Sequence, residues 1–216
     1  MKLKFFVISL LFFGYFLYRF FNSEDLELLN TSYCFYDKFL LNFTHSLNIY
    51  ISQNLYLRDI LLLFSANSLD ILMISFFFHF IKNGRCVRSL LSLILFYSFR
   101  GCLQHLFIFS FYKNYLFDYP GFISISVPFF RAADFFYSGH CGFALILTSS
   151  FKDSNESYFY YFGLFVIFLE FSIMTMITRA HYIIDAIFGL IFANYFYKIS
   201  ENILRRINKN FKTELG

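Results

Sequence analysis

Long apolar runs separated by short polar segments dominate the chain. A helix that crosses a bilayer needs about 20 mostly apolar residues. Runs of this kind cover 5–21, 57–81, 89–111, 158–177 and 182–199, and a shorter one covers 135–151. The pattern therefore predicts one all-α integral membrane domain, residues 1–216, with six transmembrane helices. The first run is followed by bulky and then acidic residues instead of a small-residue cleavage site, so it is expected to remain as a span.

The segments between the predicted spans differ in character. Within 22–57 an acidic cluster is followed by apolar residues at every fourth position from Phe35 to Ile51, which predicts an amphipathic helix at the membrane surface. Residues 112–134 hold both prolines of the chain and are expected to form an ordered, non-helical loop. Residues 152–157 form a polar turn, and 200–216 a basic tail.

The distribution of positive charge predicts the orientation of the spans. With six spans both termini lie on one side, and that side, with the turns at 82–88 and 152–157, holds 11 of the 18 Lys and Arg residues. Positive charge favours the cytosolic side of a membrane protein. The termini and the 200–216 tail are therefore expected to be cytosolic. The 112–134 loop and the 178–181 junction then lie on the lumenal or exoplasmic face.

Composition agrees with a membrane protein and excludes some other classes. The chain is 58% hydrophobic, 25% aromatic and 15% charged, which is more apolar surface than a soluble core of this length can bury. The net charge of +4 forms no basic patch of the kind that binds nucleic acid. The four cysteines have no paired spacing, so no disulfide framework, metal site or cofactor is predicted. A multi-pass protein of the endoplasmic reticulum, Golgi or plasma membrane is expected.

Two short motifs carry the candidate chemistry. The run D-F-F-Y-S-G-H ends at His140, and 41 residues later H-Y-I-I-D begins at His181. Predicted spans four and five form a hairpin that brings both histidines to the same depth on the lumenal side. Asp185 lies at i+4 from His181 and is expected to share its helix face, where the carboxylate orients the imidazole as a nucleophile. His140 is then placed to act as general acid and base.

Further polar residues accompany the pair. Ser138 and Gly139, at the start of span four, are expected to hold phosphate oxygens together with the helix N-terminal amides. Positive charge near the site would come from Arg131, Arg179 and Arg100. Charge within a membrane is costly enough to indicate function. The alternative for the intramembrane charges is mutual pairing of Asp70, Arg100 and Glu170.

The motifs D-x-x-x-S-G-H and H-Y-x-x-D resemble those of the lipid phosphate phosphatase (type 2 phosphatidic acid phosphatase) superfamily, and specifically its sphingomyelin synthase-like branch. The stretch from Thr178 to Asp185 is also similar to plant phosphatidylcholine:diacylglycerol cholinephosphotransferases. The likeness is specific over 131–190, with weaker support from Arg100 and Gln104. Asp134 matches the aspartate of the first motif and is assigned a supporting role in binding a choline or ethanolamine cation.

The resemblance implies a six-span enzyme that moves a phospho-alcohol head group between lipids by double displacement. His181 would form a phosphohistidine-type intermediate, Asp185 would orient it, and His140 would be the acid and base. Phosphatidylcholine or phosphatidylethanolamine would be the donor, and ceramide or diacylglycerol the acceptor. Homo-oligomerisation is compatible with this pattern.

Some family features are missing. Cys141 stands where Thr is common, Ile183 replaces a usual Ser or Thr, and the expected Pro-rich element before span two is absent. The phosphatase branch carries a K-x₆-R-P clamp for a terminal phosphate. The nearest match here runs from Lys82 to Arg88, with the wrong spacing and on the predicted cytosolic side. A transferase acting on a phosphodiester is therefore favoured. A lipid phosphate phosphatase and a catalytically silent lipid-binding membrane protein remain as alternatives.

Overall fold

The computed structural model describes residues 38–83, 87–106, 115–127, 129 and 137–213. The first predicted span, 5–21, lies outside the described residues. The described part of the chain is mostly helical and contains no strand. Its elements are α2 (Lys38–Gln53), α3 (Leu55–Asn83), α4 (Val87–Leu106), α5 (Gly139–Asp153), α6 (Ser157–Phe171), a π-helix η1 (Ser172–Ile177) and α7 (Ile183–Thr213).

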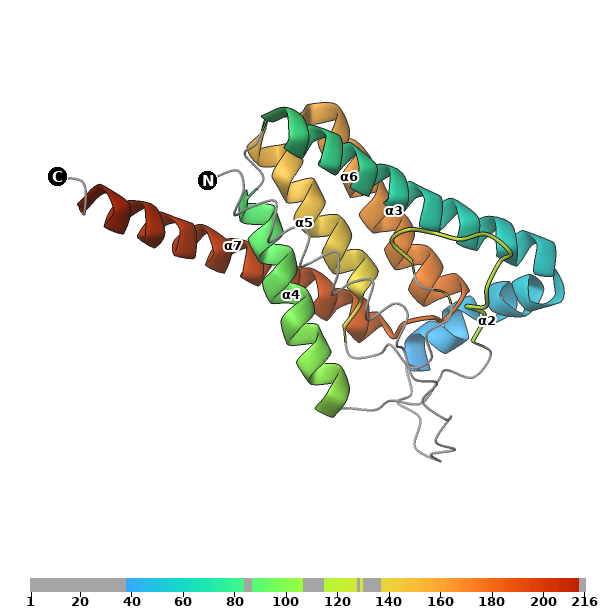
Figure 1. Ribbon diagram of the computed structural model, residues 1–216. Coiled ribbons are helices and arrows are strands. Elements are labelled where there is room, and N and C mark those ends of the chain that lie inside the picture. The colour runs from blue at the N-terminus through green and yellow to red at the C-terminus, as the bar shows by residue number, and fades with distance from the viewer. Residues whose placement is uncertain (1–37, 84–86, 107–114, 128, 130–136, 214–216) are drawn as a thin grey trace.

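The helix α5 lies at the centre of the assembly. It contacts α3, α4, α6 and α7, and α4 packs in turn against α7 while α3 packs against α6. Figure 1 shows α5 and α6 side by side, with the C-terminal part of α7 projecting away from the other helices. Apolar side chains from these helices fill the space between them, among them Leu69, Phe96, Leu147, Val166 and Ala193.

Three of the predicted spans appear as helices that are long and apolar enough to cross a membrane. They cover Leu55–Lys82, Ser157–Ile177 and Ile183–Ile207. Their outer surfaces expose large apolar side chains such as Phe78 and Phe168, which suits contact with lipid better than contact with water. Helices α4 and α5 occupy the third and fourth predicted spans. With 15 residues, α5 rises about 22 Å, which is less than the apolar thickness of a bilayer.

One predicted span boundary is wrong. The sixth span was expected to end near residue 199, but α7 continues to Thr213, so the described part of the basic tail is helical. The residues beyond 199 include no proline or glycine before Gly216, and Arg205 pairs with Glu201 one turn earlier, so nothing stops the helix. The fifth predicted span, 158–177, agrees with the apolar helical stretch Ser157–Ile177, which is α-helical to Phe171 and finishes as the π-helix η1.

The helix predicted within 22–57 is present over Lys38–Gln53, but its faces differ from the prediction, and its place at a membrane surface stays a prediction. Phe43 and Leu47 are exposed, whereas Ile51 from the same four-residue series is buried. Steps of four residues turn through more than one helical turn, so the series drifts around the helix. The buried face also holds Asn48, whose amide donates to the Ile177 carbonyl at 2.8 Å. The exposed side of the helix also carries polar groups such as His45, so it mixes apolar and polar side chains.

The polar turn at 152–157 and the non-helical loop are also present. Ser154 to Glu156 join α5 to α6, with Asn155 in the left-handed region at φ 57°. Residues 115–127 form no helix and follow an extended path beside α3, drawn in yellow-green in Figure 1.

Candidate active site

The rings of His140 and His181 lie close together, as the order of the spans predicts. Their centroids are 5.7 Å apart and the ring planes are inclined by 60°. His140 is the second residue of α5, and His181 lies in the turn between η1 and α7. His181 is only 3% exposed, whereas His140 is partly exposed. One imidazole comes from the start of α5 and the other follows η1, so both lie at the open end of the α5–α6 hairpin and share one site.

A tight turn after the π-helix positions His181. The Thr178 amide and hydroxyl both donate to the Ile173 carbonyl, and the His181 amide donates to the Met174 carbonyl at 3.0 Å. Arg179 adopts a left-handed conformation, φ 55°, that non-glycine residues rarely occupy. The chain thus reverses within five residues and holds the imidazole at the end of the hairpin.

Asp185 lies beside His181, but the two do not share a helix. The helix α7 begins at Ile183, so the expectation of a common helix face is wrong. Asp185 is instead the third residue of α7, and its Oδ2 accepts from the Tyr182 amide at 3.1 Å, as in a capping box. The same oxygen lies 3.8 Å from His181 Nδ1, an ion-pair distance longer than a hydrogen bond. The carboxylate therefore caps the helix and faces the imidazole at once.

The start of α5 is tied to the start of α7. The Ser138 hydroxyl caps α5 by accepting from the Cys141 amide at 3.3 Å, and the Ser138 amide donates to the Asp185 carbonyl at 2.8 Å. Ser138 is fully buried, so its described contacts are structural. Its predicted role in holding phosphate stays a prediction. These bonds fix the helix that carries His140 against the helix capped by Asp185.

Gly189 allows this close approach, which gives a testable prediction. A Cβ at Gly189 would lie 2.5 Å from the Ser138 carbonyl oxygen, a backbone atom that cannot move aside alone. Gly189→Ala is therefore expected to separate α5 from α7, destabilise the protein by about 1–3 kcal/mol and widen the spacing of the histidines. Thermal unfolding in detergent measures the first effect. Asn194→Ala, at an exposed position of the same helix, is the matched control and should leave the melting temperature unchanged.

Two of the predicted cations, Arg100 and Arg179, are buried close to the elements that carry the histidines. Arg100 from α4 donates through Nε to the Tyr137 carbonyl at 2.9 Å. Its guanidinium carbon would be 3.2 Å from a Cβ at Gly139, so glycine leaves room for the arginine. The Arg179 side chain is 1% exposed and lies two residues before His181. Arg131 and Asp134 lie outside the described residues.

The three charged residues that were predicted to lie within spans have separate partners. Asp70 accepts hydrogen bonds from Ser124 to Ser126 of the 115–127 segment. Glu170 accepts from the Ser65 hydroxyl at 2.7 Å, and Arg100 donates to the Tyr137 carbonyl. These contacts replace the mutual pairing of Asp70, Arg100 and Glu170 that was one interpretation of the sequence.

The sequence did not predict that residues of the 115–127 segment would contact the elements that carry the histidines. The ring of Phe117 lies 6.2 Å from the ring of His140, and the neighbouring Leu116 amide donates to the Thr178 carbonyl at 2.8 Å. The two prolines indicated an ordered loop, but no local pattern showed which side chains would contact the site.

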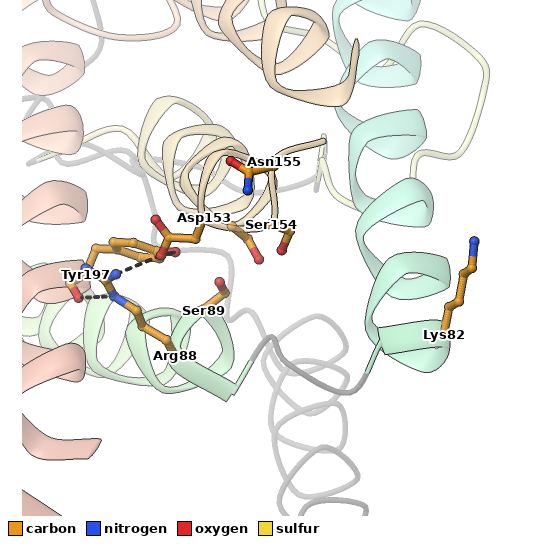
Figure 2. A pocket seen from close by; sticks show the side chains of 8 residues that line it. Lys82, Arg88, Ser89, Asp153, Ser154, Asn155 and Tyr197 are labelled. Atoms are coloured by element: carbon orange, nitrogen blue, oxygen red, sulfur yellow. Dashed lines mark hydrogen bonds and ion pairs between the residues drawn. The ribbon is translucent and has the colours of Figure 1, made fainter. Parts of the chain in front are cut away.

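The two cations nearest to the family's phosphate clamp lie at the other end of the bundle from the histidines. They are Lys82, in the last turn of α3, and Arg88, in the first turn of α4. Figure 2 shows Arg88 bonded to Asp153 and Tyr197 at the edge of a cavity of about 510 Å³, whereas Lys82 points away from them. Arg88 also pairs with Glu201 at 2.7 Å. The helix α5 carries His140 at its start and Asp153 at its end, about 20 Å away at 1.5 Å per residue. Arg88 is thus far from the histidines and paired with two carboxylates.

The arrangement combines the buried imidazole of His181 beside the Asp185 carboxylate with a second imidazole, that of His140, whose ring centroid lies 5.7 Å from the first. Two buried arginines, Arg100 and Arg179, lie on the elements around them. These are the groups that nucleophilic catalysis at phosphorus requires: a nucleophile of fixed orientation, a proton carrier and positive charge for anionic oxygens. Comparison of the chain with known protein families, with curated proteins and with solved structures gives no match.

Proposed function

We propose that the protein is a lipid head-group transferase. It moves phosphocholine or phosphoethanolamine from a glycerophospholipid to a lipid alcohol, ceramide or diacylglycerol, through a phosphohistidine-type intermediate. The observation that carries the proposal is the contact of the His140 and His181 rings at 5.7 Å, with the Asp185 carboxylate beside His181. The motif likeness to the sphingomyelin synthase-like branch supports the same chemistry.

In the first half-reaction His181 attacks the phosphorus of the donor lipid. Its Nδ1 faces Asp185, so the proton resides on Nδ1 and the Nε2 lone pair forms the bond to phosphorus. The bond between phosphorus and the diacylglycerol oxygen breaks, and His140 gives its proton to the departing alkoxide. The imidazolium that forms on His181 is stabilised by the Asp185 carboxylate.

In the second half-reaction the acceptor alcohol takes the place of the departed diacylglycerol. His140, now neutral, accepts the hydroxyl proton while the alcohol oxygen attacks phosphorus. The phosphorus–nitrogen bond breaks and its electron pair returns to Nε2 of His181. Both histidines recover their starting protonation states, so the cycle needs no cofactor and no net proton exchange with solvent.

Two features favour a diester substrate over a phosphate monoester. A monoester carries a second negative charge, for which the phosphatase branch uses its lysine and arginine clamp. Here the nearest approximation to that clamp, Lys82 and Arg88, lies at the far end of α5, and Arg88 is already paired with Asp153 and Glu201. The burial of His181 also limits the access of water as a competing acceptor.

The remaining parts of the proposal follow the charge pattern. The chain crosses the membrane six times with both termini in the cytosol, and the histidine pair opens to the lumenal or exoplasmic leaflet. The protein acts in the endoplasmic reticulum, Golgi or plasma membrane, where these lipids are present. The three helices long and apolar enough to span a bilayer are compatible with this arrangement.

A reconstituted assay tests the proposal. The purified full-length protein is placed in vesicles with phosphatidylcholine or phosphatidylethanolamine labelled in the head group, and ceramide and diacylglycerol are offered in separate reactions. Appearance of the label in a new lipid, dependent on the acceptor, is the expected result. Water-soluble phospho-alcohol, or inorganic phosphate from phosphatidic acid, released without need of an acceptor would instead identify a hydrolase. No turnover of any of these lipids would contradict both enzymatic assignments.

A further inference from the structure

We propose that Asp70 is a positioning residue that holds the 115–127 segment, here called the cover, over the histidine pair. The cover keeps water away from the phosphohistidine intermediate, so that a lipid alcohol is the acceptor. This inference rests on the proposed function for its catalytic consequence, whereas the position of the cover is independent of it.

The Asp70 carboxylate is bonded to three consecutive residues of the cover. The Ser124 hydroxyl lies 3.0 and 3.1 Å from its two oxygens. The Ile125 amide donates to Oδ2 at 3.1 Å, the Ser126 amide donates to Oδ1 at 2.8 Å, and the Ser126 hydroxyl also donates to Oδ1. Hydrogen bonds to a carboxylate are stronger than those between neutral groups. Asp70 is buried near the middle of α3, so these donors replace water around its charge.

The other end of the cover reaches the histidines. The Leu116 amide donates to the Thr178 carbonyl in the turn that carries His181. Phe117 is buried with its ring 6.2 Å from the ring of His140 and 5.1 Å from that of Phe129, on which it stacks. The segment therefore contacts the elements that carry both histidines, and Asp70 anchors it eight to ten residues further along the chain.

The cover also presents apolar side chains outward. Phe122 and Ile123 are exposed between the two anchors, Ile125 is exposed at the Asp70 anchor, and Gly121 adopts φ 83° at the bend. Exposed aromatic and aliphatic groups on a loop favour contact with the lipid interface over contact with water. The cover thus carries apolar side chains on its outer surface, which suits a long-chain alcohol as the incoming acceptor.

Loss of the Asp70 anchor has a defined consequence. Near the site the segment is held by the Leu116 bond and by an ion pair of Asp118 with Arg58 at 2.7 Å. The bonds to Asp70 anchor residues 124–126, the other end of the cover. Without them the cover opens more often and water reaches His181. Hydrolysis of the phosphohistidine intermediate then competes with transfer.

Labelling of a cysteine at the nucleophile position measures the cover without any need for activity. His181→Cys is prepared in the full-length protein in vesicles, with and without Asp70→Ala, and treated with a water-soluble thiol reagent. Labelling of the peptide that contains position 181 is followed by mass spectrometry. Asp70→Ala is expected to speed labelling by about tenfold or more, because local opening exposes the site. Equal rates in the two backgrounds would overturn the proposal.

Several variants keep this result interpretable. Asn67→Ala, at an exposed position of α3, is the matched control and should leave the labelling rate unchanged. Asp70→Asn retains one acceptor oxygen and should give an intermediate rate. If Asp70→Ala does not fold, the double variant Ser124→Ala, Ser126→Ala removes the hydroxyl donors and leaves the carboxylate bonded to the two amides. It too should speed labelling, and an unchanged rate there would overturn the proposal.

The catalytic consequence is read from the ratio of hydrolysis to transfer. With donor lipid labelled in the head group, Asp70→Ala should raise the ratio of water-soluble phospho-alcohol to new lipid several-fold, and Asp70→Asn should fall between it and the parent protein. An unchanged ratio together with faster labelling would show that the cover does not exclude the reacting water. The proposed role of the cover in favouring transfer over hydrolysis would then be overturned. If the parent protein transfers no head group, the proposed function fails, while the labelling result still decides whether Asp70 holds the cover.

Discussion

Replacement of His181 by alanine is expected to abolish head-group transfer, with a loss of at least about 10³-fold. Alanine offers no atom that can form a bond to phosphorus. His140 cannot substitute, because it lies at the start of α5 and the Asp185 carboxylate faces the His181 ring instead. The variant should still reach the membrane and fold, since the turn around His181 is held by backbone bonds to Ile173 and Met174. Transfer of labelled head group in vesicles is the measurement.

His45→Ala provides the matched control for this experiment. His45 is an exposed histidine on α2, and its replacement should leave the transfer rate within about twofold, as for most surface substitutions. Full activity in His181→Ala would exclude the double-displacement mechanism. Loss of transfer in His45→Ala as well would indicate general damage to the protein rather than a catalytic role for His181.

The meeting of the two histidines could be predicted because it depends on features that a sequence displays directly. Two apolar runs joined by the short polar turn at 152–157 form a helical hairpin, and its open end brings residue 140 close to residue 181. The structure places α5 and α6 in contact and the two rings 5.7 Å apart. Hydrophobic periodicity and a loop length were sufficient for this result.

The local geometry around His181 could not be predicted in the same way. An apolar run does not distinguish the bonding pattern of an α-helix from that of the π-helix η1. The left-handed conformation of Arg179 accompanies a contact of the adjoining Thr178 with Leu116, which is distant in sequence. For these reasons the i+4 spacing of His181 and Asp185 suggested one helix, whereas the structure has a turn followed by a capped helix.

The hydrogen-bond partners of the buried polar groups could not be predicted from the sequence either. Asp70 and Ser124 are 54 residues apart, and no periodic pattern relates an intramembrane carboxylate to hydroxyl and amide donors in a loop. The same holds for Ser65 with Glu170, which are 105 residues apart. Charge within a span indicated that these residues matter, but their partners are decided by the packing of helices whose faces the sequence leaves open.

Asp185→Asn is the second substitution with a large expected effect, about 10²–10⁴-fold in the rate of transfer. The side-chain oxygen of asparagine can still accept from the Tyr182 amide, as the carboxylate does at 3.1 Å, so the cap of α7 is kept. The neutral amide, however, no longer places a negative charge 3.8 Å from Nδ1 of His181. The imidazolium that forms when Nε2 bonds to phosphorus then loses its electrostatic stabilisation, which is the cause of the slower transfer.

Comparison with Asp185→Ala separates capping from catalysis. Alanine removes both the cap and the charge, so this variant should be as inactive as Asp185→Asn but less stable, by about 1 kcal/mol, which is typical for loss of a capping side chain. Thermal unfolding and transfer rates measured on the same preparations give the two quantities. Near-normal transfer in Asp185→Asn would mean that the side chain serves only as a helix cap. His181 would then need no carboxylate to act as the nucleophile, and the burial of the Asp185 charge beside the imidazole would have a structural cause alone.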